Sequence, residues 1–221
     1  MQMNYSLLNK ILAFFTFFIS FVIYYDTMAP TVSYWDCGEF IAVANTLGVP
    51  HPPGSPFFLL LGRIASILPI GTDIAFRVNL LSPLTSSFAV MFLYLVVVQC
   101  VRHWRGKIEN STDALIAFGG GFVGALVFAF TDSHWFNAVE AEVYAFSTFF
   151  TAIVVWLILH WSEKADEEGH ERYILIIAYM IGLATGLHLL NLLTLPFVCL
   201  LYTSDAADEG LGVDLGGRRI I

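Results

Sequence analysis

The chain has 221 residues, of which 57% are hydrophobic and only 13% are charged, and its formal net charge is -8. A composition this apolar excludes an ordinary soluble domain and predicts a protein embedded in a bilayer. The acidic balance offers no basic surface to a nucleic acid, so no nucleic-acid partner is expected.

Apolar runs long enough to cross about 30 Å of hydrocarbon occur about five times along the chain. They extend from Leu8 to Tyr25, Ile74 to Val101, Ala114 to Thr131, Val143 to Trp161 and Tyr173 to Leu195. The first run is longer than the hydrophobic core of a signal peptide, and no small-residue cleavage pattern follows it. We therefore expect a retained helix. The shorter stretch from Pro56 to Leu68 suits an interfacial or re-entrant helix. The sequence therefore predicts an all-α polytopic membrane protein.

Lysine and arginine near the ends of these runs predict the orientation of the chain, because cationic loops stay in the cytoplasm. The cations precede the first run, follow the second, and lie between the fourth and fifth: Lys10, Arg102, Arg105, Lys107, Lys164 and Arg172. The N-terminus is therefore predicted to be cytoplasmic. Loops 26–73 and 132–142 are predicted to lie outside, although Arg63 and Arg77 depart from the rule.

The first external loop carries two carboxylates, Asp36 and Glu39, between Trp35 and Phe40. If residues from about 38 to 47 are helical, Asp36 lies at the N-cap and Glu39 in the first turn, which is the pattern of a capping pair. Carboxylates beside aromatic rings at a membrane surface could instead form a general base with a raised pKa, or a site for an acceptor hydroxyl. The sequence leaves both hypotheses open.

Farther along the same loop, His51 precedes the turn Pro52-Pro53-Gly54. Proline fixes φ and glycine permits unusual φ values, so the turn should hold His51 in a set direction. Such a turn can be purely structural. Because His51 lies on the same side of the membrane as Asp36, it is also a candidate contact for a phosphate or a hydroxyl.

The second external segment, residues 132–144, combines carboxylates with aromatic residues: Trp135, Glu140, Glu142 and Tyr144. Solvated turns seldom carry so many aromatic residues, although Trp135 also suits the aromatic belt at a membrane interface. Glu140 and Tyr144 are four residues apart and are expected to share a face at the start of a span. We expect both to point into one external vestibule.

Two more polar residues, His188 and Asn191, are expected one turn apart near the outer end of the last predicted span. Either they contact a substrate, or they form hydrogen bonds with a neighbouring helix. Their predicted depth matches that of the other polar residues.

The cysteines do not point to a site. Cys37, Cys100 and Cys199 are odd in number and scattered. Their spacing indicates neither a disulfide framework nor a metal site.

From Cys199 onward the sequence changes abruptly to an acidic, glycine-rich string that ends at Ile221. Residues 199–209 look like one reading frame of a transposase-type sequencing-library adapter, and residues 213–221 look like the flow-cell adapter that follows it. We therefore expect a native membrane domain at residues 1–198, with residues 199–221 not native. The alternative is a disordered acidic C-terminus.

Taken together, the motifs resemble those of a bacterial membrane family grouped with protein O-mannosyltransferases of the glycosyltransferase-C superfamily. The resemblance covers residues 5–198. The motifs are, in chain order, Asp36-Cys-Gly-Glu39, His51-Pro-Pro-Gly54, Trp135 with Glu140-Ala-Glu142-Val-Tyr144, Gly186-Leu-His188-Leu-Leu-Asn191, and Pro196.

The resemblance implies a transferase that moves a sugar, expected to be a mannose-type hexose, from a polyprenyl-phosphate carrier to a Ser or Thr hydroxyl of an exported protein. Asp36 matches the essential acidic residue of that superfamily, with Glu39 as the second catalytic carboxylate. We expect substrate contacts from His51, Trp135, Glu140, Glu142, Tyr144, His188 and Asn191. A divalent metal is an open question, because carboxylates could serve as base or as ligands.

The resemblance also implies a bacterial inner membrane as the location, with the active site on the periplasmic side. The chain is shorter than the full membrane domain of that superfamily, so we expect it to be the N-terminal part and inactive by itself. Sugar identity, acceptor and oligomeric state are not predicted.

Two other classes of function stay open. In a transporter or channel, Asp36, Glu140 and His188 would line a path, but such a path needs polar groups across the midplane. The first two spans offer little beyond Asn79, Ser82 and Ser86. A non-catalytic assembly subunit would be indicated if the carboxylates proved dispensable.

Overall fold

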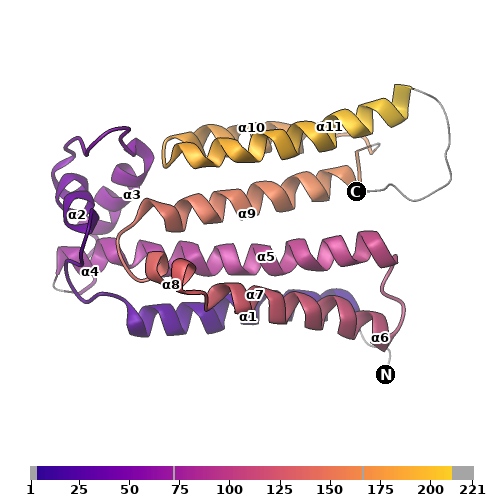
Figure 1. The fold of residues 1–221 in the computed structure, drawn as a ribbon, viewed down its shortest axis with the longest axis horizontal. Helices are drawn as coiled ribbons and strands as arrows, with labels where there is room; N and C mark the ends of the chain where they lie inside the picture. The colour runs from indigo at the N-terminus through magenta and orange to yellow at the C-terminus, as the bar shows by residue number, and fades with distance from the viewer. Residues whose placement is uncertain (1–3, 72, 166, 211–221) are drawn as a thin grey trace.

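A computed structural model describes residues 4–71, 73–165 and 167–210, with the backbone alone described for 204–210. The described residues contain helices and no strand. Figure 1 shows the long helices lying side by side, with a layer of short helices at one end. The all-α polytopic prediction is therefore confirmed. The last eleven residues of the predicted adapter segment, 211–221, lie outside the described part of the chain.

Within the described chain, four helical segments are long and apolar enough to cross a membrane. They correspond to the first four predicted spans. They are α1 (Tyr5–Thr27), α4 with α5 (Ile74–Asn79 and Leu81–Arg105), α6, η1 and α7 (Ser111–Ala114, Leu115–Gly119, Gly120–Ala129), and α9 (Val143–Ser162). The central helix α5 packs against α1, α7 and α9.

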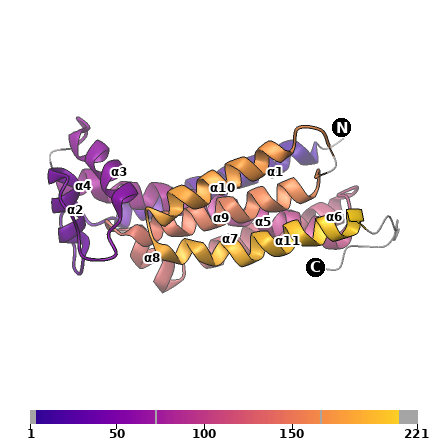
Figure 2. The ribbon, with the colours of Figure 1, turned by 90° about the horizontal axis from the view of Figure 1, so that it is seen from above.

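The fifth predicted span is not one helix. Helix α10 (Glu171–Thr185) ends before Gly186, the 3-10 helix η2 spans Leu189–Leu193, and α11 (Thr194–Gly210) follows. The break lies at His188, whose backbone is extended with φ -156°. Helix α10 rises only about 22 Å, which is less than the hydrocarbon thickness. Both α10 and α11 pack against α9, as Figure 2 helps to show.

A layer of short helices covers one end of the bundle in both views. It consists of α2 (Cys37–Thr46), α3 (Pro56–Ile67) and α4, with the short helix α8 (Asp132–Ala138) close by. Helix α3 has proline in its first turn and twelve residues, which confirms the predicted short apolar helix. It packs closely on α2, because a Cβ at Gly62 would lie 2.8 Å from the Cβ of Ala44.

The two arginines that break the orientation rule are bound to backbone carbonyl groups at this end. The Arg77 guanidinium donates to the carbonyls of Ile70 at 2.8 Å and Ser66 at 2.9 Å. Arg63 donates to the carbonyl of Asn45. These side chains satisfy the carbonyls at helix ends, so packing accounts for their position. The predicted orientation stays a prediction.

Candidate functional site

The backbone at the start of α2 leaves the Asp36 carboxylate without a capping role. Trp35 has φ 58°, which is uncommon for a bulky residue, and Asp36 then adopts an α-helical conformation with φ -77°. A capping residue is normally extended. The Asp36 side chain makes no capping hydrogen bond and is 56% exposed. The capping hypothesis is therefore wrong for Asp36, and its carboxylate is accessible to a ligand.

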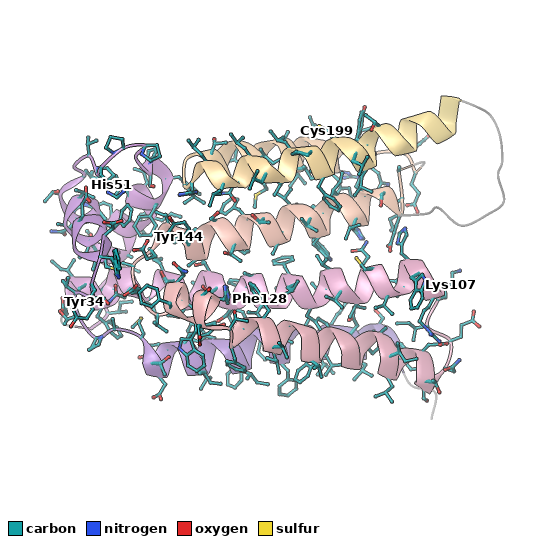
Figure 3. All side chains as sticks on the ribbon, viewed as in Figure 1. Tyr34, His51, Lys107, Phe128, Tyr144 and Cys199 are labelled. Carbon is teal, nitrogen blue, oxygen red and sulfur yellow. The ribbon has the colours of Figure 1, made fainter. Side chains whose placement is uncertain are left out.

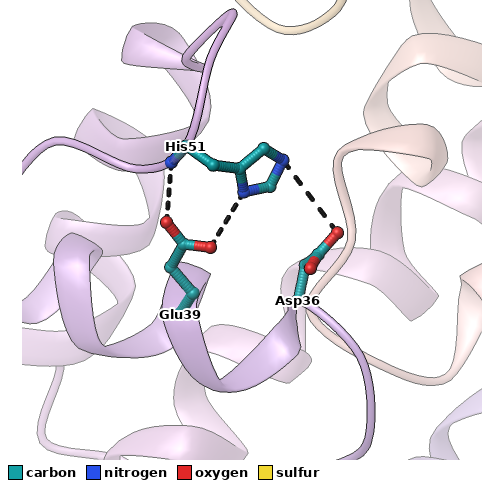
Figure 4. Close-up of side chains that lie close together, drawn as sticks. All are labelled: Asp36, Glu39 and His51. Carbon is teal, nitrogen blue, oxygen red and sulfur yellow. Dashed lines mark hydrogen bonds and ion pairs between the residues drawn. The ribbon is translucent and has the colours of Figure 1, made fainter.

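Glu39 holds His51 through both carboxylate oxygens (Figure 4). The backbone N–H of His51 donates to Glu39 Oε1 at 2.6 Å, and the ring Nδ1 lies 2.8 Å from Oε2. This hydrogen bond places the ring proton on Nδ1 and leaves Nε2 directed toward Asp36 Oδ2, 4.0 Å away. The structure thus brings together Asp36, Glu39 and His51, which the sequence predicts only to lie in the same external loop.

The same hydrogen bond shifts the pKa values of both partners. It holds the pKa of the Glu39 carboxyl below its usual range and raises the pKa of His51, with the nearby Asp36 charge adding to the second effect. The expectation of a raised carboxyl pKa is therefore wrong for Glu39. Glu39 is an anion that orients the imidazole, which is a positioning role.

The turn after His51 is attached to the end of α10. The Gly54 N–H donates to the His51 carbonyl at 3.0 Å, and Gly54 has φ 78°, which glycine adopts without strain. The Ser55 hydroxyl then donates to the Leu187 carbonyl at 2.8 Å, and the Phe57 N–H donates to the Gly186 carbonyl at 2.9 Å. Hydrogen bonds therefore fix the His51 loop against the break before η2.

A second group of acidic and thiol side chains is buried behind Asp36. Ligand atoms of Cys37, Glu140 and Glu142 lie within 4.8 Å of one another, and all three residues are buried. The Cys37 thiol donates to Glu142 Oε1 at 3.7 Å, and the Ser33 hydroxyl donates to Glu140 Oε2. The Glu140 Oε1 atom is buried and has no hydrogen-bond partner among the described residues. Burial chiefly raises the pKa of Glu142 to about 7 and also raises that of Cys37.

We expect Glu142→Gln to stabilise the protein at pH 8 and to have little effect at pH 5. The Glu142 carboxyl loses its proton near pH 4.5 in the unfolded chain and near pH 7 in the folded protein. Between these two pH values the folded state therefore binds more protons than the unfolded state. Wild-type stability should therefore fall as pH rises from about 5 to 8. Thermal unfolding of both proteins against pH measures the difference, with exposed Glu109→Gln as the control. A difference that does not grow with pH would contradict a buried, protonated Glu142.

Tyr144 packs against His188 rather than sharing a helix face with Glu140. Their rings lie 5.0 Å apart, with Tyr144 on α9 and His188 in the break between α10 and η2. The expected shared face of Glu140 and Tyr144 is wrong, because α9 begins only at Val143. Glu140 precedes the helix and is buried, whereas Tyr144 is 43% exposed. Tyr144 and His188 form an accessible aromatic pair.

Trp135 and Asn191 have structural partners instead. The Trp135 Nε1–H donates to Thr27 Oγ1 at 3.2 Å, and its ring packs against Tyr24 on α1. Asn191 is buried and donates to the carbonyls of Ala184 at 3.1 Å and His188 at 2.9 Å, which stabilises the break after α10. Neither residue joins the groups around Asp36 and Glu142.

Three polar residues near this end of the bundle are not predicted as site residues by the sequence: Ser33, Cys37 and His134. Cys37 is adjacent to Asp36, but the scattered cysteines gave no signal of a contact with Glu142. His134 is buried on α8 against Phe128, and burial lowers its pKa to about 4. It is therefore a neutral core histidine at physiological pH.

Two sets of side chains have the donor chemistry of a divalent-cation site. Asp36, Glu39 and His51 form one set, and Cys37 with Glu140 and Glu142 forms the other; in each set the ligand atoms lie within 4.8 Å. Carboxylate, imidazole and thiolate are the ligands that Zn²⁺ accepts. The negative charge of the neighbouring Glu140 and Glu142 carboxylates could be neutralised by a cation or by a proton.

Comparison with known proteins gives consistent matches. Residues 36–210 match the family described as the Protein O-mannosyl-transferase TMEM260 N-terminal domain. The chain is 32% identical over 203 residues to "Protein O-mannosyl-transferase tmem260" of Dictyostelium discoideum, covering 85% of this chain and 23% of the relative. It is 31% identical over 150 residues to "Protein O-mannosyl-transferase TMEM260" of Mus musculus, covering 67% and 19%. The chain thus spans less than about a quarter of these relatives' length. No solved structure matches it.

Proposed function

Because the chain belongs to the TMEM260 family of protein O-mannosyl-transferases, we propose that it forms the acceptor-activating part of a membrane glycosyltransferase. The full-length protein transfers a mannose-type hexose to a Ser or Thr hydroxyl of an exported protein. The donor is the sugar linked to a polyprenyl phosphate.

In the proposed reaction, Asp36 acts as the general base. The acceptor oxygen attacks the anomeric carbon, the bond from that carbon to the phosphate oxygen breaks, and polyprenyl phosphate leaves. The hydroxyl proton passes to the Asp36 carboxylate. A single displacement with inversion at the anomeric carbon needs one base, whereas hydrolytic glycosidases use a pair of carboxylates.

This proposal rests mainly on one observation: the exposed Asp36 carboxylate lies beside the imidazole of His51, which Glu39 holds in place. The Asp36 side chain is exposed and makes no capping hydrogen bond, and His51 Nε2 lies 4.0 Å away, fixed by Glu39. His51 Nε2 can accept a hydrogen bond from the acceptor or, when charged, contact the donor phosphate. The nearby pair of Tyr144 and His188 offers aromatic surface on which a sugar or an aromatic side chain can pack.

The lipid-linked donor fits a site at the end of a membrane bundle. Helix α3 presents large exposed apolar side chains at this end, including Leu60 and Ile64, where a polyprenyl chain can lie in the bilayer. The location of the site on the face away from the cytoplasm rests on the distribution of Lys and Arg. The proposed location in a bacterial inner membrane rests on the family resemblance alone.

The donor class is tested with membranes that contain the full-length protein. Labelled mannose is offered either on polyprenyl phosphate or on a nucleotide, and protein-bound label is measured. The proposal expects covalent label from the lipid-linked donor only. Label that crosses sealed vesicles without covalent product would instead favour the transporter hypothesis, and label from the nucleotide sugar alone would contradict the donor.

We also propose that residues 199–221 are not native, although the family match extends to residue 210. Helix α11 crosses the expected junction without interruption, and helix formation does not depend on the origin of the sequence. Resequencing of the gene across the codon for Val198 should give a different continuation. An unchanged sequence from independent DNA would overturn this proposal.

A further inference from the structure

The end of the bundle opposite the α2–α4 layer carries a cavity that the transfer site does not use. Figure 3 shows Lys107 at this end, and Tyr34 and His51 at the other. The cavity has a volume of about 320 Å³ and lies between the start of α1 and the end of α5. Its lining includes Tyr5, Ser6, Asn9, Arg102, Lys107 and Phe118.

Two cations line this cavity without a carboxylate partner. Among the described residues, neither Arg102 nor Lys107 forms an ion pair, whereas neighbouring Arg105 lies 3.5 Å from Asp113. Arginine and lysine close together favour an anion, and phosphate oxygens suit the donors of arginine. The cavity is therefore electrostatically suited to a phosphate group.

Asn9 adds a neutral donor to the same cavity. Its Oδ1 accepts a hydrogen bond from the Tyr94 hydroxyl at 2.8 Å, which orients the amide. The amide NH₂ therefore remains able to donate to a ligand. The hydroxyl groups of Tyr5 and Ser6, which also line the cavity, can donate as well.

An apolar groove of about 310 Å³ adjoins the cavity, and Phe118 lines both. Leu8 and Leu12 on α1 form one wall, and Leu115 and Gly119 of the π-helix η1 form the other. Such π-helical turns are frequent at functional sites. A ligand that fills both spaces must have an anionic head and an apolar tail.

We propose that the cavity and groove together bind one anionic phospholipid, with its phosphate between Arg102 and Lys107 and one acyl chain along α1. Basic pockets between helices at the membrane surface are suited to such headgroups. A free phosphate would use the cations but would leave the groove empty, so the groove favours a lipid. The proposal does not depend on the transfer reaction.

Native mass spectrometry of the detergent-purified full-length protein tests this proposal, with phosphatidylglycerol, phosphatidylcholine or inorganic phosphate as the probe. Wild type should retain one phosphatidylglycerol. Arg102→Gln with Lys107→Gln should weaken its binding by about 30-fold. Lys10→Gln removes a charge at the same end but does not line the cavity, so it should bind as wild type does.

A second pair of variants tests the groove. Gly119→Leu should fill it and weaken lipid binding, whereas Gly120→Leu should not, because the exposed neighbour Gly120 does not line the groove. A melting curve of each variant without added lipid shows that it is folded. Equal binding of phosphatidylcholine, displacement by inorganic phosphate, or unchanged binding in the double variant would each overturn the proposal.

Discussion

Replacement of Asp36 by Asn is expected to lower the rate of sugar transfer by about 10²–10⁴-fold, the usual contribution of a general base. An amide keeps the size of the side chain but cannot accept the hydroxyl proton. Because Asp36 makes no capping hydrogen bond and is exposed, the variant should remain folded. Initial rates with the full-length protein, together with a thermal melt, measure both effects.

Asp26→Asn is the matched control for this variant. Asp26 is also an exposed carboxylate and lies in the last turn of α1, ten residues before Asp36. Its replacement removes an equal charge, and Asp26 forms no ion pair with His51. Equal loss in both variants would indicate a general electrostatic effect, and full activity of Asp36→Asn would exclude a base at this position.

Gly62→Val is expected to destabilise the protein by about 1–3 kcal/mol, the usual cost of overpacking. A Cβ at this position would lie 2.8 Å from the Cβ of Ala44, and neither atom belongs to a flexible side chain. The helices α2 and α3 must therefore separate. Because Glu39 is on α2 and His51 precedes α3, the separation should also break their contact and slow transfer.

Unfolding midpoints in detergent measure this effect, and Gly62→Ala should give a smaller loss. Gly124→Val on α7 is the control, because a Cβ there meets nothing within 4 Å. If Gly62→Val were as stable as Gly124→Val, the close packing of α2 on α3 would be wrong.

The spans could be predicted because a membrane helix needs only a long apolar run. The break between α10 and η2 could not be predicted, because the residues around His188 are apolar enough to continue a membrane span. The break is stabilised by Asn191 and by the Phe57 N–H. These contacts are made through tertiary packing, which hydropathy does not report.

The proximity of Asp36, Glu39 and His51 could be inferred from the sequence, because the three residues lie in one loop around a short helix. The group of Cys37, Glu140 and Glu142 was not. Cys37 and Glu142 are 105 residues apart and meet only because α2 lies over the start of α9. The roles of Glu39 and Asn191 could be assigned only from the hydrogen-bond partners that the structure gives them.

Transfer of a hexose to a hydroxyl with Asp36 as the base is tested by the mass of an acceptor peptide after incubation with mannosyl polyprenyl phosphate and the full-length protein. The peptide carries one Ser or Thr, and a matched peptide carries Ala instead. We expect one added hexose on the hydroxyl peptide only, and none with Asp36→Asn. Addition to the Ala peptide, or equal addition by Asp36→Asn, would contradict it.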